Sequence, residues 1–467
     1  MFKAIYPAVL GLSLLAGCSM APEYQRPESP AASSYPYASN DNNAALDAVP
    51  QWRAYYANSE LQHLIELALE NNRDLRISEL TTERIRAYYR IQSAALLPSL
   101  NASASDTRQR TPADLSYSGE SGISDSYAVG LQMPAYELDF FGRILSLKDQ
   151  ALQQYLATEE AQHSAEIALV AAVANQYHQL VALKEQAKLA SEAKVTAKRA
   201  YAINQDSFDA GVGSELDLRT AEAQYQSYRA SELAYIDQVR QAQNALALLI
   251  GTDLPELAAD SSLLNGEHAP IDLPVGLPSE LLTQRPDIRA AEHTLEGAHA
   301  NIGAARAAFF PSVQLTAFGG TASAELSDLF KSGSAQWSFS PQISLPIFSA
   351  GRNQANLDVA WIQQRIEIAN YEKAIQTAFR EVADALAVRR TIDQRIEAQA
   401  ERVKAAQRRS SLSQQRFDAG VDSYLPVLLA QQELFSAQKD LVQAQLTKLN
   451  NQSALFAALG GGWQSND

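Results

Sequence analysis

The sequence predicts a mainly helical, internally duplicated chain with a short β region in each half. Phe208-Asp209-Ala210-Gly211-Val212 returns as Phe417-Asp418-Ala419-Gly420-Val421, 209 positions later. Each copy lies between long segments rich in Ala and Gln, and apolar and polar residues alternate upstream of each. Alternation is typical of a strand with one buried face. A repeated stretch in matching surroundings indicates a doubled domain.

The duplication extends beyond this stretch. Leu97-Pro98-Ser99-Leu100 corresponds to Phe310-Pro311-Ser312-Val313, 213 positions later, and Gly142-Arg143 corresponds to Gly351-Arg352, 209 positions later. The second β region is therefore four residues shorter than the first. The Asp-x-Arg of Arg73-Asp74-Leu75-Arg76 also returns, in Arg285-Pro286-Asp287-Ile288-Arg289. A period of this length is not that of a solenoid unit.

The predicted organisation has six segments. They are a signal peptide (1–17), a lipid-anchored N-terminal tether (18–60), a first repeat (61–254), a connector (255–282), a second repeat (283–459) and a tail (460–467). The tether is rich in Pro, Ser, Ala and Asn, and we expect it to be extended. The connector contains several prolines and joins the two halves.

The first residues carry a secretory signal pattern. Lys3 precedes an apolar run from Val9 to Leu15, which is too short for a membrane anchor. Leu15-Ala16-Gly17-Cys18 resembles the bacterial lipobox, in which signal cleavage leaves the cysteine as a lipid-modified N-terminus. Ser19 stands where an Asp indicates inner-membrane retention, so this resemblance implies a lipoprotein of the outer membrane. Several acyl chains on Cys18, palmitate among them, make anchoring stable.

Composition limits the classes of function. The 467-residue chain has a formal net charge of −15, with 38 Lys and Arg against 53 Asp and Glu. This balance argues against a nucleic-acid partner, which requires a basic surface. Cys18 is the single cysteine, which excludes a disulfide framework. Six histidines are scattered along the chain, and we expect no metal site, no cofactor and no catalytic centre.

The β regions have a distinctive composition. Their alternate positions carry Ser, Asn, Thr, Gln or small residues rather than charges. A single strand of this kind fits a soluble sandwich, but four in a mostly helical chain favour a transmembrane barrel with lipid outside and water inside. We expect the strands to include Leu100 and to continue to Ile347. The residues predicted to face lipid are Tyr127, Val129, Leu131, Trp337, Phe339, Ile343 and Leu345.

The helical segments are unusually long. Arg143 to Phe208 and Arg352 to Phe417 contain no Pro or Gly and predict helices of about 90 Å, at ~1.5 Å per residue. A shorter helix is expected from Leu61 to Ile91, interrupted at Asn71-Asn72. Apolar residues seven apart indicate coiled-coil packing, and a plain soluble coiled coil is the alternative. The most regular series is Leu428, Phe435, Val442, Leu449 and Phe456.

Two tight turns are expected between these helices. Gly211 and Gly420 tolerate φ > 0 and stand where each long helix must end. Ser214 and Ser423 are expected to cap the helices that follow.

Four strands per chain cannot close a barrel, and open sheet edges are not tolerated in lipid. Bacterial single-chain barrels start at about eight strands. If the strands are transmembrane, the chain must therefore associate. Three copies would give an even antiparallel count, so we predict a homotrimer with a 12-stranded β-barrel, continuing into a 12-helix α-barrel.

Several stretches carry a resemblance to a known family. They are Cys18 to Pro27 (CSMAPEYQRP), Asp139-Phe140-Phe141-Gly142-Arg143, Gln284-Arg285-Pro286-Asp287-Ile288, Pro346 to Arg352 (PIFSAGR) and the two Phe-Asp-Ala-Gly-Val turns. The chain resembles the TolC/OprM-like outer membrane efflux proteins (outer-membrane factors), in particular their lipid-anchored NodT-type branch. The resemblance implies a passive exit duct for drugs or other small toxic compounds, which extends from the outer membrane into the periplasm. It also implies a periplasmic adaptor (membrane fusion) protein and an inner-membrane pump, usually of the resistance–nodulation–division class.

The resemblance further implies a periplasmic gate where the helices converge at the repeated turns. The polar candidates, which as an alternative are solvated turn residues, are Asp209, Glu215, Asp217, Arg219, Arg416, Asp418, Asp422 and Tyr424. The family often has an acidic residue one turn after the leucine aligned with Leu425, but here that position is Leu429. We therefore prefer an apolar ring of Leu425 and Leu429, which closes a pore by dewetting.

Two other functions remain open. One is a type I protein-secretion duct, although the lipobox favours the drug or metal efflux branch. The other is a lipid-anchored periplasmic coiled-coil scaffold without a pore, against which the alternating strands argue. The sequence does not identify the transported substrate, because in this family the partner pump usually selects it.

Overall fold

The computed structural model describes residues 19–32, 34–36, 49–257, 263, 270–273 and 285–462. The predicted signal peptide, Cys18 and most of the predicted connector lie outside the described residues. The chain forms two compact units, each of which draws on both halves of the sequence. Of the described residues, those within 19–28, 82–158 and 291–371 form the sheet unit, and those within 29–81, 159–290 and 372–462 form the helical unit.

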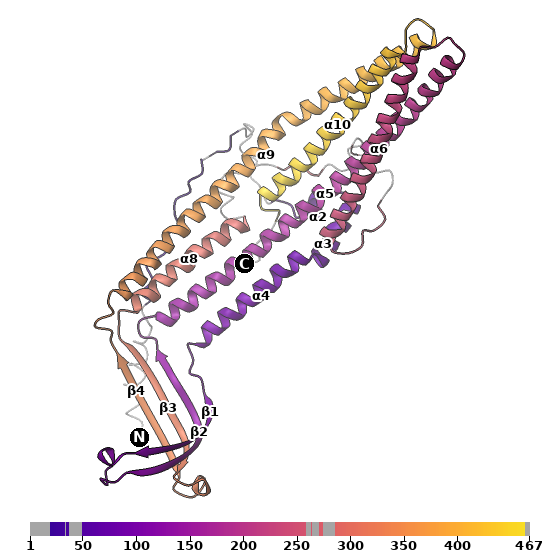
Figure 1. Ribbon diagram of the computed structural model, residues 1–467. Helices are drawn as coiled ribbons and strands as arrows, with labels where there is room; N and C mark the ends of the chain where they lie inside the picture. The colour runs from indigo at the N-terminus through magenta and orange to yellow at the C-terminus, as the bar shows by residue number, and fades with distance from the viewer. Residues whose placement is uncertain are drawn as a thin grey trace. The chain divides into compact units, whose positions relative to one another are not determined.

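The sheet unit contains a four-stranded antiparallel meander in the order β1-β2-β3-β4 (Figure 1). The strands are β1 (Asn101–Thr111), β2 (Gly122–Leu138), β3 (Ser312–Ser323) and β4 (Ala335–Ser344). The central pair, β2 and β3, joins the two halves of the duplication. Strands β1 and β4 are the edges of this sheet, so each has one side without a strand partner among the described residues.

The strand register confirms the predicted alternation, because residues directly opposite one another share a face. Leu131 of β2 lies opposite Gly319 of β3, which lies opposite Trp337 of β4. Other rows of the same face contain Val129, Phe339 and Ile343. The opposite face carries mainly polar and small residues, among them Ser103, Gln132, Gln314, Ser338, Ser340 and Gln342. The sheet therefore has one apolar and one polar face, except toward the end of β1, where Asp106, Arg108 and Arg110 lie on the otherwise apolar face.

Two predicted strand ends are wrong for the single chain. Strand β4 ends at Ser344, which leaves Leu345 and Ile347 outside it, and β1 begins at Asn101, after Leu100. The last pair of the β3–β4 ladder is Ser312 with Ser344, so nothing holds the following residues in register. Pro346 also lacks the N–H that would extend the ladder.

The long helices match their prediction closely. Helices α5 (Arg143–Asp209) and α9 (Arg352–Asp418) each contain 67 residues. Each is followed by a second helix, α6 (Glu215–Ile250) or α10 (Leu425–Ala458). The remaining long helix of the second repeat is α8 (Pro286–Ala307). In the part of the chain that the structure describes, no helix is both long and apolar enough to cross a membrane.

The first repeat begins with a helix that breaks where predicted. Helix α3 (Ser59–Asn71) and helix α4 (Arg73–Ala94) are separated by Asn72. The Asn72 Oδ1 accepts a hydrogen bond from the Leu75 N–H (2.9 Å), and its Nδ2 donates to the Leu249 carbonyl (2.8 Å). A short helix, α2 (Trp52–Tyr55), precedes α3, so the end of the predicted extended tether is partly helical.

The core of the helical unit follows the predicted seven-residue series. Leu428, Val442, Leu449 and Phe456 of α10 are all buried. Phe456 stacks on Tyr55 of α2 with ring centroids 4.4 Å apart. The Tyr55 hydroxyl donates to the Gln452 carbonyl (2.8 Å), which satisfies its polar atom inside this core.

Candidate functional site

The two repeated turns have the same backbone. Gly211 and Gly420 adopt φ of 74° and 71°, as their sequence position predicts. The Val212 N–H donates to the Ser207 carbonyl (3.0 Å), and the Val421 N–H donates to the Arg416 carbonyl (2.9 Å). These bonds satisfy carbonyls that the end of a helix would otherwise leave unpaired.

The helices that follow the turns begin differently. Ser214 caps α6 as predicted, because its Oγ accepts from the Leu216 N–H (3.1 Å). The prediction that Ser423 caps α10 is wrong: the N-cap residue is Tyr424, without a side-chain cap bond. If Ser423 were the cap, Pro426 would be the third helical residue, and it has no N–H to donate.

The structure brings the two turns together in one packed group, which we call the helical tip. Its buried members are Ala221, Tyr424, Val427 and Leu428, and the half-buried residues packed against them are Ala200, Tyr201 and Phe417. The Gln432 Nε2 also donates to the Gln224 Oε1 (2.6 Å), which joins α10 to α6. The tip therefore contains the ends of α5, α6, α9 and α10.

The polar gate candidates lie at this tip in different settings. Asp209 and Asp418 each accept a hydrogen bond from the glutamine four residues earlier, at 2.9 and 2.8 Å. Asp217 is half-buried in the first turn of α6. Glu215 and Arg219 form an exposed ion pair along α6 (3.6 Å).

Arg416 and Asp422 form a two-pronged ion pair across the second turn. The Arg416 Nε and Nη2 donate to the two Asp422 carboxylate oxygens, at 2.5 and 3.0 Å. These hydrogen bonds hold the pKa of Asp422 below its usual value. Tyr424, another candidate, is only 3% exposed and belongs to the core of the tip. Its burial raises its pKa to about 12.

The two apolar gate candidates face away from this core. Leu425 and Leu429 are four residues apart, so they share one face of α10. They are 51% and 46% exposed, whereas Val427 and Leu428 between them are buried. The start of α10 thus presents two leucines that are each about half exposed, outside the buried core of the tip.

A further contact was not predicted from the sequence. The Tyr24 hydroxyl donates to the Glu292 Oε1 (3.1 Å), and the Arg26 Nε and Nη2 donate to the two Glu292 oxygens, at 2.6 and 2.8 Å. The Arg306 Nη1 donates to the Met20 carbonyl (3.0 Å). Burial and the Glu292 charge raise the pKa of Tyr24. The predicted tether therefore begins as a strap, residues 20–27, fastened along α8. No local pattern in the sequence predicts the contact between Arg26 and Glu292, which are 266 residues apart.

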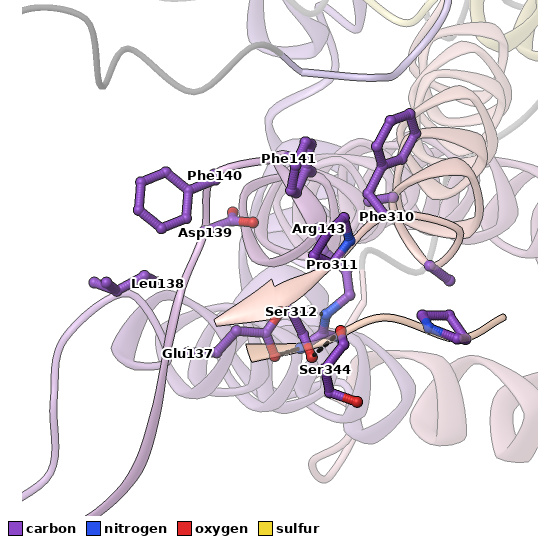
Figure 2. A pocket seen from close by; sticks show the side chains of 13 residues that line it. Glu137, Leu138, Asp139, Phe140, Phe141, Arg143, Phe310, Pro311, Ser312 and Ser344 are labelled. Atoms are coloured by element: carbon purple, nitrogen blue, oxygen red, sulfur yellow. Dashed lines mark hydrogen bonds and ion pairs between the residues drawn. The ribbon is translucent and has the colours of Figure 1, made fainter. Parts of the chain in front are cut away.

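The junction between β2 and α5 surrounds a cavity of about 220 Å³ (Figure 2). The Asp139 Oδ2 accepts from the Leu145 N–H in the first turn of α5 (2.7 Å). Arg143 donates to both Glu137 oxygens, at 2.8 and 2.7 Å. Phe141 stacks on Phe310 with centroids 4.8 Å apart, while Phe140 points away from this pair (Figure 2). The motif Asp-Phe-Phe-Gly-Arg is accounted for by these structural contacts.

The described residues contain no group of three or more His, Cys, Asp or Glu side chains placed to hold a metal ion. The groups assembled at the tip are turn glycines, an ion pair and exposed leucines. The glycines and the ion pair can fix the positions of the helix ends, and the leucines can present an apolar surface to water.

Comparison with known proteins gives consistent matches along the whole chain. A family model described as "Outer membrane efflux protein" matches residues 64–252 and 277–461. The solvent efflux pump outer membrane protein SrpC of Pseudomonas putida is 48% identical, over 99% of this chain and 98% of its own length. The antibiotic efflux pump outer membrane protein ArpC of the same species is 44% identical, over 99% and 96%.

Solved structures agree. The open state of the Neisseria gonorrhoeae MtrE outer membrane channel superposes with a TM-score of 0.82 and 40% identity, over 95% of this chain and 98% of that one.

Proposed function

Since the chain belongs to the outer membrane efflux protein family, we propose that it carries solvents, antibiotics or other small toxic compounds out of the cell. The protein lies in the outer membrane and is the exit duct of a tripartite efflux system. It works with adaptor and pump proteins, because its relatives are the outer membrane components of efflux pumps. The proteins it matches are efflux channels rather than enzymes.

The two-faced sheet is the observation that carries the proposal. One face bears Trp337, Phe339 and Ile343, and the other bears Ser and Gln, which suits lipid on one side and water on the other. Both sheet edges lack a partner within the described chain. Closure by three copies would pair every edge and enclose a water-filled lumen, so we assign a homotrimer with lipid against the apolar face.

The gate is assigned to Leu425 and Leu429. Their exposure beside the buried core of the tip supports a position on the lumen in the trimer. Three copies of each would form a ring with no group to hydrogen-bond an ion, and water leaves such a constriction readily. The ion pair of Arg416 and Asp422 would hold each second turn in place beside this ring.

The anchor is assigned to a lipidated Cys18, and the pump to the resistance–nodulation–division class. The strap that follows Cys18 supports a fixed attachment of the N-terminus to the sheet unit. Mass spectrometry of the N-terminal peptide tests the anchor: an unmodified cysteine, or cleavage elsewhere, would contradict it.

Transport is tested in a host strain that lacks its own exit duct and is supplied with a matching adaptor and pump. We expect the chain to restore tolerance to toluene and to antibiotics. Restored secretion of a protein substrate, without tolerance, would instead indicate the type I secretion duct. A protein that inserts but conducts no ions in a planar bilayer, even with its adaptor, would indicate a scaffold.

The gate is tested in the same bilayer. Replacing both leucines (Leu425→Ser with Leu429→Ser) should wet the ring and raise the resting conductance of an intact trimer. The matched control is Leu216→Ser, since Leu216 is the equivalent exposed leucine of the first turn. Unchanged conductance in the double variant would indicate that the pore is closed instead at the turns around Asp209 and Asp418.

A further inference from the structure

One residue of the sheet departs from the composition of its face. Phe318 of β3 lies opposite Gln132 of β2 and Ser338 of β4, so its side chain is on the polar face. Among the residues that the strand register pairs, no other large apolar side chain lies on that face. Phe318 is half-buried, so part of its ring is open on this side of the sheet.

The ring of Phe318 lies over a stretch of bare backbone. Gly130 and Gly320 are directly opposite each other on the polar face, and a Cβ on Gly320 would collide with the Val129 carbonyl oxygen. A Cβ on Gly130 would come within 2.5 Å of the Gly319 carbonyl oxygen and 2.8 Å of the Phe318 Cζ. The two strands therefore approach too closely for side chains at these positions. The Phe318 ring leans diagonally across β2 into the space that the glycines leave.

Covering these glycines does not by itself require an aromatic ring. A glutamine, which this face carries at several positions, has a similar length and would leave a polar surface instead. Strand β3 lies between β2 and β4, so pairing of the sheet edges with other copies would leave Phe318 uncovered. The neighbours of the ring on this face are amides, hydroxyls and glycines. The result is a flat apolar floor with polar groups around it.

We propose that Phe318 is a contact site inside the lumen for small aromatic compounds, with its ring as the floor and Gln132 and Ser338 as a polar rim. This inference rests on the proposed exit duct, in which the polar face lines the lumen, and it locates a contact for the cargo. An aromatic compound that stacks on the ring is held about two- to tenfold more strongly than on a polar wall. The rim can hydrogen-bond a hydroxyl or amine substituent of that compound.

Cysteine protection in the full-length trimer tests the site. The reporter is Ser338→Cys, directly opposite Phe318, and the control is Gln342→Cys, four residues further along the same face of β4. Each variant is labelled with a membrane-impermeant maleimide, with and without millimolar p-cresol, which is toluene bearing a hydroxyl. The mass of the labelled peptide separates the reporter from Cys18, the only native cysteine. We expect p-cresol to slow the labelling of Ser338→Cys by at least about twofold and to leave that of Gln342→Cys unchanged.

Two substitutions separate contact with the cargo from cover of the glycines. Phe318→Gln still covers Gly130 and should keep the trimer intact, but it removes the apolar floor and should abolish the protection of Ser338→Cys. Phe318→Tyr keeps the ring and should retain the protection. Absence of protection in Ser338→Cys itself, or equal protection after Phe318→Gln, overturns the contact site and leaves the exit duct standing.

Failure of the proposed duct gives a different result in the same experiment. Trp337 lies on the apolar face, so lipid should shield Trp337→Cys from the maleimide while Ser338→Cys reacts. Labelling of Trp337→Cys without labelling of Ser338→Cys would show that the polar face does not line a water-filled lumen, and it would overturn the duct together with the site.

Discussion

The two turns of the helical tip begin from the same five residues and reach different surroundings. Both have a glycine at positive φ and matching backbone hydrogen bonds as far as Val212 and Val421, and in the first turn the Gly213 N–H also donates to the Ser207 carbonyl. In the first turn Phe208 and Leu216 are exposed, and the helix that follows is capped by Ser214. The second turn is tied by Arg416 and Asp422 and is followed by the buried Tyr424.

This difference distinguishes the features of a turn that its local sequence determines from those that tertiary contacts determine. The shared Phe-Asp-Ala-Gly-Val determines where the helix stops and how the backbone reverses, since both turns have these residues and the same positive φ at the glycine. The side chains that follow determine whether the turn is fixed to the core. At the position of Glu215 the second copy has Tyr424, and at the position of Gly213 it has Asp422. The second turn is therefore the better anchored of the two.

The largest expected effect comes from the core side chain of the second turn. Tyr424→Ala would leave a cavity among Ala221, Val427 and Leu428, and large-to-small changes of this kind cost about 3 kcal/mol or more. We expect faster hydrogen exchange at the start of α10. Leu216→Ala, at an exposed leucine of the first turn, should change exchange by less than about 0.5 kcal/mol. Equal effects in both turns would contradict the difference described here.

The glycines should respond alike. A Cβ at Gly211 or Gly420 would meet no atom within 4 Å, so only the positive φ opposes a side chain. Gly211→Ala and Gly420→Ala should each destabilise their own turn by about 1 kcal/mol, measured by hydrogen exchange of the flanking amides. A clearly larger destabilisation by one of the two substitutions would show that the two turns are not stabilised by the same local interactions.

The serines should respond differently. Ser214→Ala removes the bond to the Leu216 N–H and should cost about 1 kcal/mol at the start of α6. Ser423→Ala removes no cap bond of α10 and should have an effect near zero. Amide exchange in the first turns of α6 and α10 gives both values in one experiment. A loss of stability in Ser423→Ala comparable with that in Ser214→Ala would show that Ser423 also caps its helix.

The smallest effect concerns pH. The folded pKa of Asp422 is lowered by Arg416, so the pair contributes stability above the ordinary Asp pKa of about 3.9. That contribution is lost as pH falls through the lower, folded value. We expect amides of the second turn to exchange relatively faster in acid than those of the first, once the intrinsic pH dependence is removed. Arg416→Gln should abolish this difference.

Much of the fold could be predicted from the sequence, and the failures share one cause. The limits of α5 and α9 were predictable to one residue, because Gly precedes each start, Gly follows each end and neither helix contains a breaker. The two faces of the sheet follow from period two. The end of β4, the strap partner of Arg26 and the burial of Tyr424 depend on residues distant in the sequence.

The equal length of α5 and α9 has a consequence for how such a chain can change through evolution. Both helices keep the 209-residue offset from their first residue to their last. The β regions that precede them, by contrast, differ in length by four residues. Deleting one residue from one helix would draw in its end by ~1.5 Å and rotate it by roughly 100°. If the deletion were in α9, the second turn would be displaced from Ala221 of α6 and from Ala200 and Tyr201 of α5, with which it forms the core of the tip. We therefore expect these helices to tolerate substitutions one at a time, and insertions or deletions only as matched pairs, one in each repeat.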